Sequence, residues 1–253
     1  RECLIGYFTA VTAMDAGIGR LIACLEELGI REDTLVFFVS DNGFNCGHHG
    51  IWGKGNGTLV PNMFDTSVKV PAIASHPGVI PAGVVSGAMI SGYDFMPTLL
   101  DYVGIDATED STLPGVSRSP EFLGHGHDSE KDIVVFDEYG PVRMIRTREW
   151  KYVHRYGTGS DELYDLRRDP GERSNLVDEV STKATIGELH GRLERWFDRY
   201  VDPTLDASKQ PVCGAGQTGL VGQKSAGLPV FVTEREDSFD PSHDPGMASR
   251  NKP

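Results

Sequence analysis

The sequence predicts an α/β domain whose mostly parallel sheet is flanked by helices, followed by a smaller unit with an antiparallel sheet and one packed helix. A long helical pattern ends at Gly29 and leads through a short turn into the apolar, β-branched run of residues 34–40. Such a run is typical of a strand buried on both faces, and helix, turn and strand together make half of a βαβ unit. After residue 130 the chain changes to short strand-like runs joined by tight turns, which is typical of antiparallel sheets.

The first helix is predicted over about residues 4–28. Its apolar stripe, with spacings of three and four, consists of Ile18, Leu21, Ile22, Leu25 and Leu28. A glycine directly after such a stripe commonly ends a helix in the left-handed conformation. Cys3 and Cys24 also fall on this helix, where a buried free thiol is the expected state.

A second helix is predicted over residues 92–103, with Asp94 as its candidate N-terminal cap. The composition then turns to Asp, Ser, Gly, Pro and His, which marks an internal boundary near residue 129. We therefore expect an α/β part over residues 1–129, a small α+β unit over 130–202 and an irregular tail over 203–253. The run His125-Gly126-His127-Asp128 has the residue types of a metal site, but a polar loop is the favoured interpretation.

The small unit is predicted from four strand-like runs, at residues 132–138, 142–147, 150–156 and 162–166. The helix that packs on them carries the apolar stripe Ile186, Leu189, Leu193, Trp196, Phe197 and Tyr200. The strands also carry a basic cluster, which consists of Arg143, Arg146, Arg148, Lys151, His154 and Arg155. Acidic residues surround this cluster, so we expect a solvated sheet face and not a nucleic-acid surface.

Composition and charge narrow the class of protein. The chain has 253 residues, 39% of them hydrophobic, and a formal net charge of −13, which disfavours a polyanionic partner such as nucleic acid. We expect no segment that spans a bilayer and no secretory signal within these residues, so the compartment is not predicted. The four cysteines show no Cys-x-x-Cys spacing and are too few for a disulfide scaffold.

The candidate site follows the buried strand. Asp41 and Asn42 stand at its carboxyl end, and a glycine-broken loop then carries His48, His49 and Lys54. The crevice beyond the carboxyl ends of strands is where open α/β sheets bind ligands. Spacing alone leaves the alternative open that these residues form a solvent-exposed polar turn.

Several motifs, in one order and spacing, resemble the sulfatase family of the alkaline phosphatase superfamily. They are Thr12-Ala13-Met14-Asp15-x-x-x-Gly19-Arg20-Leu21, Phe38-Val39-Ser40-Asp41-Asn42-Gly43, His49-Gly50-x-Trp52-Gly53-Lys54, Val70-Pro71 with Pro77-Gly78, Phe95-Met96-Pro97-Thr98-Leu99-Leu100, Glu162-Leu163-Tyr164-Asp165-Leu166, Asp169-Pro170-x-Glu172 and Asn175-Leu176. The resemblance extends from the first residues to about Tyr200, and it implies an alkaline phosphatase-like α/β domain with a small C-terminal domain.

The resemblance also implies site roles. Asp41 and Asn42 match the later pair of ligands for a divalent cation, usually Ca²⁺, and oxygen donors suit such a cation. Lys54 matches the lysine that contacts the sulfate group, and His49 is carried over as a catalytic or substrate-binding residue that lines the site. The family's nucleophile is a formylglycine made in a C/S-x-P-x-R motif, and none of the four cysteines begins such a motif. The sequence thus resembles the C-terminal portion of a sulfatase, without the formylglycine segment.

Three functions follow as hypotheses. The first is metal-dependent hydrolysis of a sulfate ester, on a small molecule or a glycan, with the nucleophile supplied from outside these residues. The second is a phosphodiesterase or phosphonate monoester hydrolase of the same superfamily. The third is a catalytically incompetent fragment that binds an anion or pairs with a separate N-terminal polypeptide.

Overall fold

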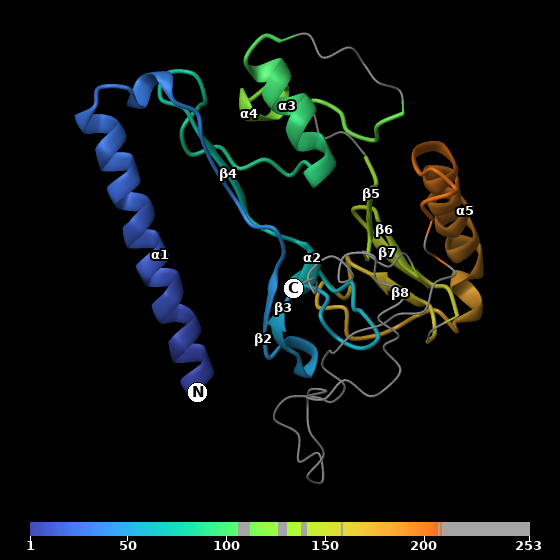
Figure 1. Ribbon diagram of the computed structural model, residues 1–253. Helices are drawn as coiled ribbons and strands as arrows, with labels where there is room; N and C mark the ends of the chain where they lie inside the picture. The colour runs from blue at the N-terminus through green and yellow to red at the C-terminus, as the bar shows by residue number, and fades with distance from the viewer. Residues whose placement is uncertain (106–111, 126–130, 138–140, 158, 207, 209–253) are drawn as a thin grey trace, which may run out of the picture. The chain divides into compact units, whose positions relative to one another are not determined.

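The computed structural model describes residues 1–105, 112–125, 131–137, 141–157, 159–206 and 208 (Figure 1). The described chain divides into two compact units. The first consists of Arg1–Asp41 and Val70–Ile133, and the second of Asn42–Lys69 together with the described residues from Val134 onward. The segment that carries Asn42, His49 and Lys54 is therefore part of the C-terminal unit, while Asp41 ends the other one. Most of the expected tail over 203–253 lies outside the described residues.

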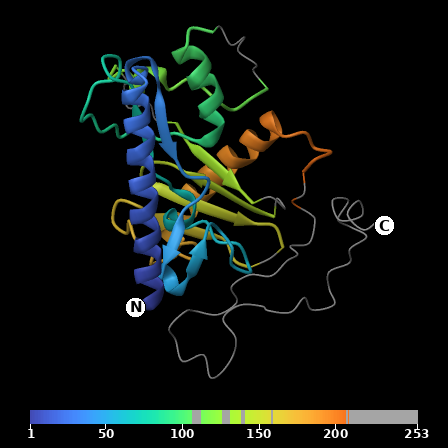
Figure 2. The same ribbon diagram turned by 60° about the vertical axis from the view of Figure 1, so that its left-hand side comes forward.

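The first unit begins with α1 (Glu2–Glu27), which runs as one continuous helix from the N-terminus (Figure 2). Leu28 caps it and Gly29 follows in the left-handed region with φ +70°, as the sequence predicts. A 3₁₀ turn, η1 (Arg31–Asp33), then leads into β1 (Val36–Val39). The helix, the glycine stop and the strand are confirmed.

The predicted parallel sheet is not confirmed. β1 pairs with β4 (Ala72–Ser75), and the pairing is antiparallel, with Val36 opposite Ser75. Among the described residues these two strands form a two-stranded sheet, so β1 is half-buried and not covered on both faces. The periodicity of the run indicates a strand but carries no information about which strand lies beside it.

α1 differs from the expectation in two ways. None of its residues is buried, and Cys3 and Cys24 are both exposed, because no described element packs over the apolar stripe. α1 is also long and apolar enough to cross a bilayer when judged by length and composition alone, although the core helix of a soluble protein or a signal sequence meets the same criterion. The expectation that these residues hold no such segment is therefore not confirmed.

The rest of the first unit is built around Asp94. The 3₁₀ turn η3 (Gly92–Asp94) leads into α3 (Phe95–Tyr102), and α4 (Ser119–Phe122) follows. Asp94 is fully buried and accepts hydrogen bonds from the amides of Ser91 and Val116, at 3.0 and 2.9 Å. Lys131 and Arg118 neutralise its charge, with Nζ and Nε at 2.6 and 3.8 Å from its carboxylate. The His-rich run considered as a metal site falls outside the described residues from position 126 on.

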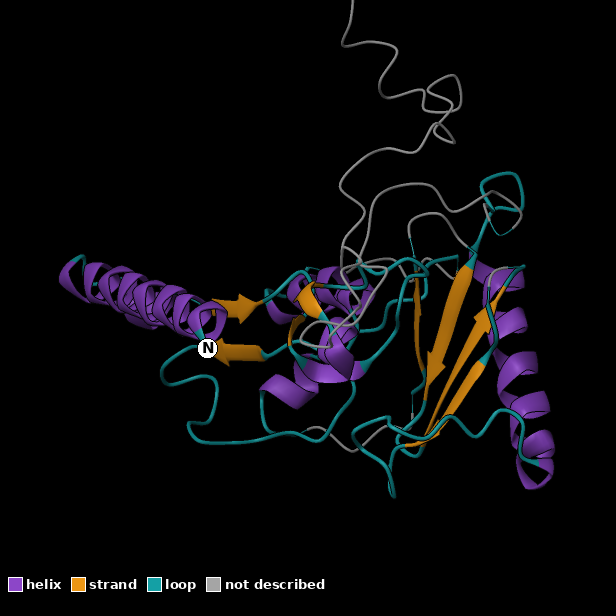
Figure 3. Ribbon diagram, turned by 90° about the horizontal axis from the view of Figure 1, so that it is seen from below, coloured by secondary structure: helices purple, strands orange, loops and turns teal. Residues whose placement is uncertain are grey.

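The second unit contains the expected small sheet. Its strand order is β5 (Ile133–Phe136), β6 (Val142–Arg146), β7 (Trp150–Arg155) and β8 (Glu162–Asp165). β7 pairs antiparallel with both β6 and β8. A 3₁₀ turn, η4 (Val180–Thr182), precedes α5 (Lys183–Tyr200), and Figure 3 shows α5 along one face of the strands. The C-terminal antiparallel sheet with its packed helix is confirmed.

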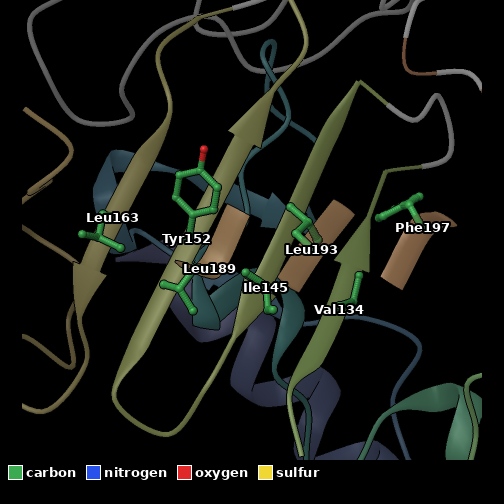
Figure 4. Packing of buried hydrophobic residues seen from close by; sticks show 7 residues of the cluster. All are labelled: Val134, Ile145, Tyr152, Leu163, Leu189, Leu193 and Phe197. Atoms are coloured by element: carbon green, nitrogen blue, oxygen red, sulfur yellow. The ribbon is translucent and has the colours of Figure 1, made fainter. Parts of the chain in front are cut away.

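The core of the second unit lies between α5 and the sheet (Figure 4). Its buried residues are Val134, Ile145, Tyr152, Leu163, Leu189, Leu193 and Phe197. The helix residues belong to the predicted stripe, so the apolar face of α5 packs where its spacing of three and four predicts. Burial of these side chains is the main favourable term that holds the unit together.

On the opposite face of the sheet, the expectation that the basic cluster lies on a solvated surface is wrong for Lys151 and Arg155. Along β7, Lys151, Val153 and Arg155 alternate with the residues that face α5, and they pack against residues 60–68 of the same unit. Lys151 is 0% exposed, and Arg155 is 9% exposed. These cations are buried because a backbone carbonyl and a carboxylate meet each of them, so the face is not solvated.

Candidate active site

The candidate site is organised by a short hairpin in the second unit, β2 (Phe44–Cys46) and β3 (Trp52–Lys54), joined by the 3₁₀ turn η2 (His48–Gly50). The register pairs Phe44 with Lys54 at the base and Cys46 with Trp52 near the tip. The loop reverses direction through Gly47, which has φ +96° and precedes the turn. A side chain at that backbone conformation would be strained, so the glycine is required by the turn.

Lys54 lies at the base of the hairpin, and the residue after it lies against Asn42. Lys54 is exposed, and among the described residues its ammonium has no hydrogen-bond or ion-pair partner. The next residue, Gly55, lies against the Asn42 side chain, so closely that a Cβ there would stand 3.4 Å from the Asn42 Cγ. The segments that carry Asn42 and Lys54 are thus adjacent in this unit.

Gly43 joins these segments to the chain behind them. Its amide donates to the Ser67 carbonyl at 2.8 Å, and its own carbonyl accepts from the Gly55 amide at 2.8 Å. A Cβ on Gly43 would stand 2.2 Å from the Thr66 carbonyl oxygen. The Asp-Asn-Gly motif therefore needs its glycine for a close backbone approach, a requirement that sequence reasoning missed by treating the residue as a turn signal.

A buried polar network lies behind the hairpin. Asn45, 0% exposed, donates from Nδ2 to the Ser67 hydroxyl at 2.7 Å and accepts from the Thr66 hydroxyl at 2.5 Å. The Ser67 hydroxyl in turn donates to the Asn62 Oδ1 at 2.5 Å. Sequence reasoning missed these residues, because single Asn, Ser and Thr side chains in a loop give no signal of burial.

Asp41 and Asn42 are neighbours in the chain and offer a carboxylate and an amide oxygen. Both are hard oxygen donors, the type that Ca²⁺ takes, and the exposed Asp41 carboxylate is accessible to solvent. Because Ca²⁺ takes about six to eight oxygen ligands, these two side chains fit only part of such a site. In the portion of the chain that the structure describes, no group of three or more His, Cys, Asp or Glu side chains is placed to hold a metal ion.

His49 lies at the hairpin tip, in the left-handed region with φ 54°, and its ring stacks flat on Phe64 with 3.6 Å between centroids. Burial lowers the pKa of His49, and the charges of His48, Lys151 and Arg173 lower it further, against a smaller opposite effect of Asp169. The imidazole is therefore neutral at neutral pH.

The hairpin separates His49 from Lys54. The register places Lys54 at the base and His49 beyond the tip pair, and within the described chain the two side chains share no hydrogen bond or ion pair. The structure thus places Asn42 against the residue after Lys54, whereas His49 lies at the other end of the hairpin.

Comparison with known proteins now decides the family. A family model described as "N-sulphoglucosamine sulphohydrolase, C-terminal" matches residues 47–199, more than half of the chain. The chain belongs to the sulfatase family. This sulfatase is 30% identical over 230 residues to an N-acetylglucosamine-6-O-sulfatase of Bacteroides thetaiotaomicron, covering 85% of this chain and 39% of the relative. The matched range of the family model includes His49 and Lys54 and begins after Asn42.

Solved structures agree with this assignment. The sulfatase chain superposes with a TM-score of 0.67 and 28% identity on a structure in complex with its substrate D-glucosamine-2-N,6-O-disulfate, covering 79% of this chain and 41% of that one. A phosphonate monoester hydrolase of Agrobacterium radiobacter is also similar, with a TM-score of 0.62 and 27% identity over 76% of this chain and 40% of that one. The chain spans about two-fifths of the length of these relatives.

Proposed function

We propose that the chain supplies part of the active site of a metal-dependent sulfuric ester hydrolase. The observation that carries the proposal is the exposed ammonium of Lys54, which has no hydrogen-bond or ion-pair partner among the described residues, in a member of the sulfatase family. The next residue, Gly55, lies against the Asn42 side chain. A cation at this position suits an ester that carries negative charge on its sulfuryl oxygens.

Each candidate residue has a proposed role. Lys54 binds the sulfate group and neutralises the charge that develops on its oxygens as the ester bond breaks. Asp41 and Asn42 would hold a divalent cation, with Ca²⁺ as the proposed metal, and the bound ion would supply further positive charge to the site. His49, with a neutral imidazole, lies at the hairpin tip away from Lys54, so its proposed role is a hydrogen bond to a more distant part of the substrate.

The nucleophile is proposed to lie outside these residues. None of the four cysteines begins a C/S-x-P-x-R motif, and the two on α1 belong to a helix and not to a reactive loop. A formylglycine of the family's type would supply the attack on sulfur. The residues described above then bind and orient the ester for that attack.

The proposed substrate is a sulfate ester of a small molecule or of a glycan. Two similar proteins support this class, one named as an N-acetylglucosamine-6-O-sulfatase and one bound to a disulfated glucosamine. The second candidate is phosphonate monoester or phosphodiester hydrolysis, which the similarity to the phosphonate monoester hydrolase favours. The third is a non-catalytic sulfatase-like fragment that binds an anion or a partner chain.

A substrate panel separates these candidates. The chain, extended by its upstream coding sequence, is assayed on aryl sulfates, sulfated glucosamines, a phosphonate monoester and a phosphodiester, each with and without a chelator. We expect the highest kcat/KM on a sulfate ester, with turnover lost in the chelator. A higher kcat/KM on the phosphonate would establish the second candidate, and no turnover of any ester would leave the third.

A further inference from the structure

We infer that Ser67 and Asn45 are positioning residues for Asn42 and Lys54, and that Asp65 and Lys151 anchor them to the C-terminal sheet. The inference rests on the proposed function, since it assigns these residues an effect on the proposed sulfate site. All of the residues belong to the second compact unit.

The short helix α2 (Asp65–Val68) packs against strand β2 of the hairpin. Ser67 makes two kinds of contact there. Its carbonyl accepts the Gly43 amide at 2.8 Å, and its hydroxyl joins Asn45 and Asn62. Ser67 is 1% exposed and Asn62 is 6% exposed, so water does not compete for these bonds.

Two glycines connect these contacts to the proposed site. Gly43 directly follows Asn42, and Gly55 directly follows Lys54. The Gly55 amide donates to the Gly43 carbonyl at 2.8 Å, and Asn45 Nδ2 lies 3.4 Å from the Gly55 carbonyl. A displacement of Ser67 therefore moves the backbone beside both site residues.

Side chains of the sheet anchor the start of α2. Arg146 of β6 donates two hydrogen bonds to the Asp65 carboxylate, at 3.1 and 2.9 Å. Lys151 of β7 donates to the same carboxylate at 2.6 Å and to the Met63 carbonyl at 2.8 Å. Glu172 pairs with Lys151 and accepts the Asp65 amide at 2.6 Å. The start of α2 is thus held from both its backbone and its side chain.

The chemistry of the network argues for a role beyond stability. A buried polar network contributes little more to stability than apolar packing of the same volume, but it fixes one arrangement of the groups that it joins. An active site needs its groups held within about half an ångström of the productive geometry. The network joins the sheet to Gly43 and Gly55, the residues that follow Asn42 and Lys54, so it constrains the backbone of both site residues.

The test compares two buried-hydroxyl deletions in the chain extended by its upstream coding sequence. Ser67→Ala removes the hydroxyl of the network. Thr98→Val is the matched control in the other unit, where Thr98 is 2% exposed, donates to the Asp94 carbonyl at 2.5 Å and accepts the Arg118 amide at 2.9 Å. Each variant is measured for Tm, for kcat and KM, for inhibition by inorganic sulfate, and for amide hydrogen exchange of residues 42–56.

We expect both variants to lose a comparable part of their Tm. Only Ser67→Ala should lower kcat, by roughly 10- to 100-fold, weaken sulfate inhibition and speed exchange over residues 42–56. Equal kcat values and equal exchange in the two variants would overturn the inference. If Ser67→Ala does not fold, Asp65→Asn decides by the same measurements, because it loosens α2 from the sheet.

Different results would contradict the positioning role and the proposed function. If the unmodified enzyme hydrolyses a phosphonate and no sulfate ester, the proposed function fails, and the comparison of the two variants is made on the phosphonate. If it hydrolyses no ester, the exchange rates of residues 42–56 and the binding of inorganic sulfate decide the positioning role.

Discussion

Lys54 carries the charge on which the account depends. Its ammonium is exposed and has no partner in the described chain, whereas Lys151 and Arg155 of the same unit are buried and paired. An exposed cation contributes little to folding, and the proposal gives this one a binding function. Binding of an anionic group is that function in the proposal.

Replacement of this cation tests the role directly. In the extended enzyme, Lys54→Ala should lower kcat/KM by about 100- to 1,000-fold, because charge stabilisation in the transition state is lost. The Tm should stay within about 1–2 °C, since an exposed unpaired side chain contributes little stability. Lys69→Ala, also exposed and in the same unit, is the control and should leave both values unchanged. A Lys54→Ala enzyme with normal kcat/KM would remove this residue from the site.

Gly43 gives a second prediction at the residue scale. Gly43→Ala places a Cβ 2.2 Å from the Thr66 carbonyl oxygen, so the backbone contact must open at a cost of roughly 2 kcal/mol or more. Gly187→Ala is the counterpart, because Gly187 is exposed within α5 and a Cβ there meets nothing within 4 Å. That variant should be more stable by about 0.5–1 kcal/mol. Urea unfolding of the two variants measures the contrast, and equal stabilities would contradict the reported approach of Gly43 to Thr66.

At the scale of elements, the contact between α2 and the sheet depends on pH. Burial by itself would raise the pKa of Asp65, but hydrogen bonds and charge from Arg146 and Lys151 outweigh it and lower the value to about 2. A lowered folded-state pKa contributes stability that is present above about pH 4 and lost as the pH falls through about 2. The pKa of Glu172 shifts in the opposite direction. Burial raises it, and this effect is larger than the lowering by the charge and hydrogen bond of Lys151.

Asp65→Asn isolates this contribution. At pH 6 the variant should be less stable than the unmodified protein by about 2 kcal/mol, and the difference should shrink toward zero between pH 4 and pH 2. Denaturant unfolding at several pH values measures it. A difference that does not change with pH would mean that the carboxylate charge of Asp65 does not stabilise α2.

The sequence patterns predicted where helices and strands form far better than they predicted which segments pack against them. The helix ending at Gly29, the stripe of α5 and the antiparallel pairing of β6, β7 and β8 all follow from local periodicity and turn chemistry. The partner of β1 and the burial of Lys151 do not. Both depend on a segment far along the chain, β4 in one case and the Met63–Asp65 backbone in the other.

The candidate site was predictable to a similar extent. Asp41, Asn42 and Lys54 stand out by residue type and by resemblance, and their site roles stay predictions; the structure places Gly55, the residue after Lys54, against Asn42. The residues that hold them, Asn45 and Ser67, did not stand out, because nothing in the sequence shows that their amide and hydroxyl meet in a buried contact at 2.7 Å. The residues that hold a site in place are determined by tertiary packing, which a sequence motif does not show.

At the scale of the whole molecule, α1 leaves a large apolar surface without cover in the described chain. Ile5, Phe8 and Leu21 are 57, 61 and 68% exposed. An apolar surface of this kind drives association. The 253-residue chain on its own should therefore self-associate in sedimentation velocity, and Phe8→Glu should reduce the association where Glu26→Gln does not. A monodisperse monomer over a wide range of concentrations would contradict this reading of α1.

The central claim is that this chain contributes the cation and sulfate contacts of a sulfatase site while the nucleophile comes from elsewhere. The most direct measurement is the turnover of an aryl sulfate by the 253-residue chain and by the same chain extended with its upstream coding sequence, at equal concentration and with Ca²⁺ present. We predict turnover by the extended enzyme and none by the 253-residue chain. Turnover by the 253-residue chain alone would contradict the claim.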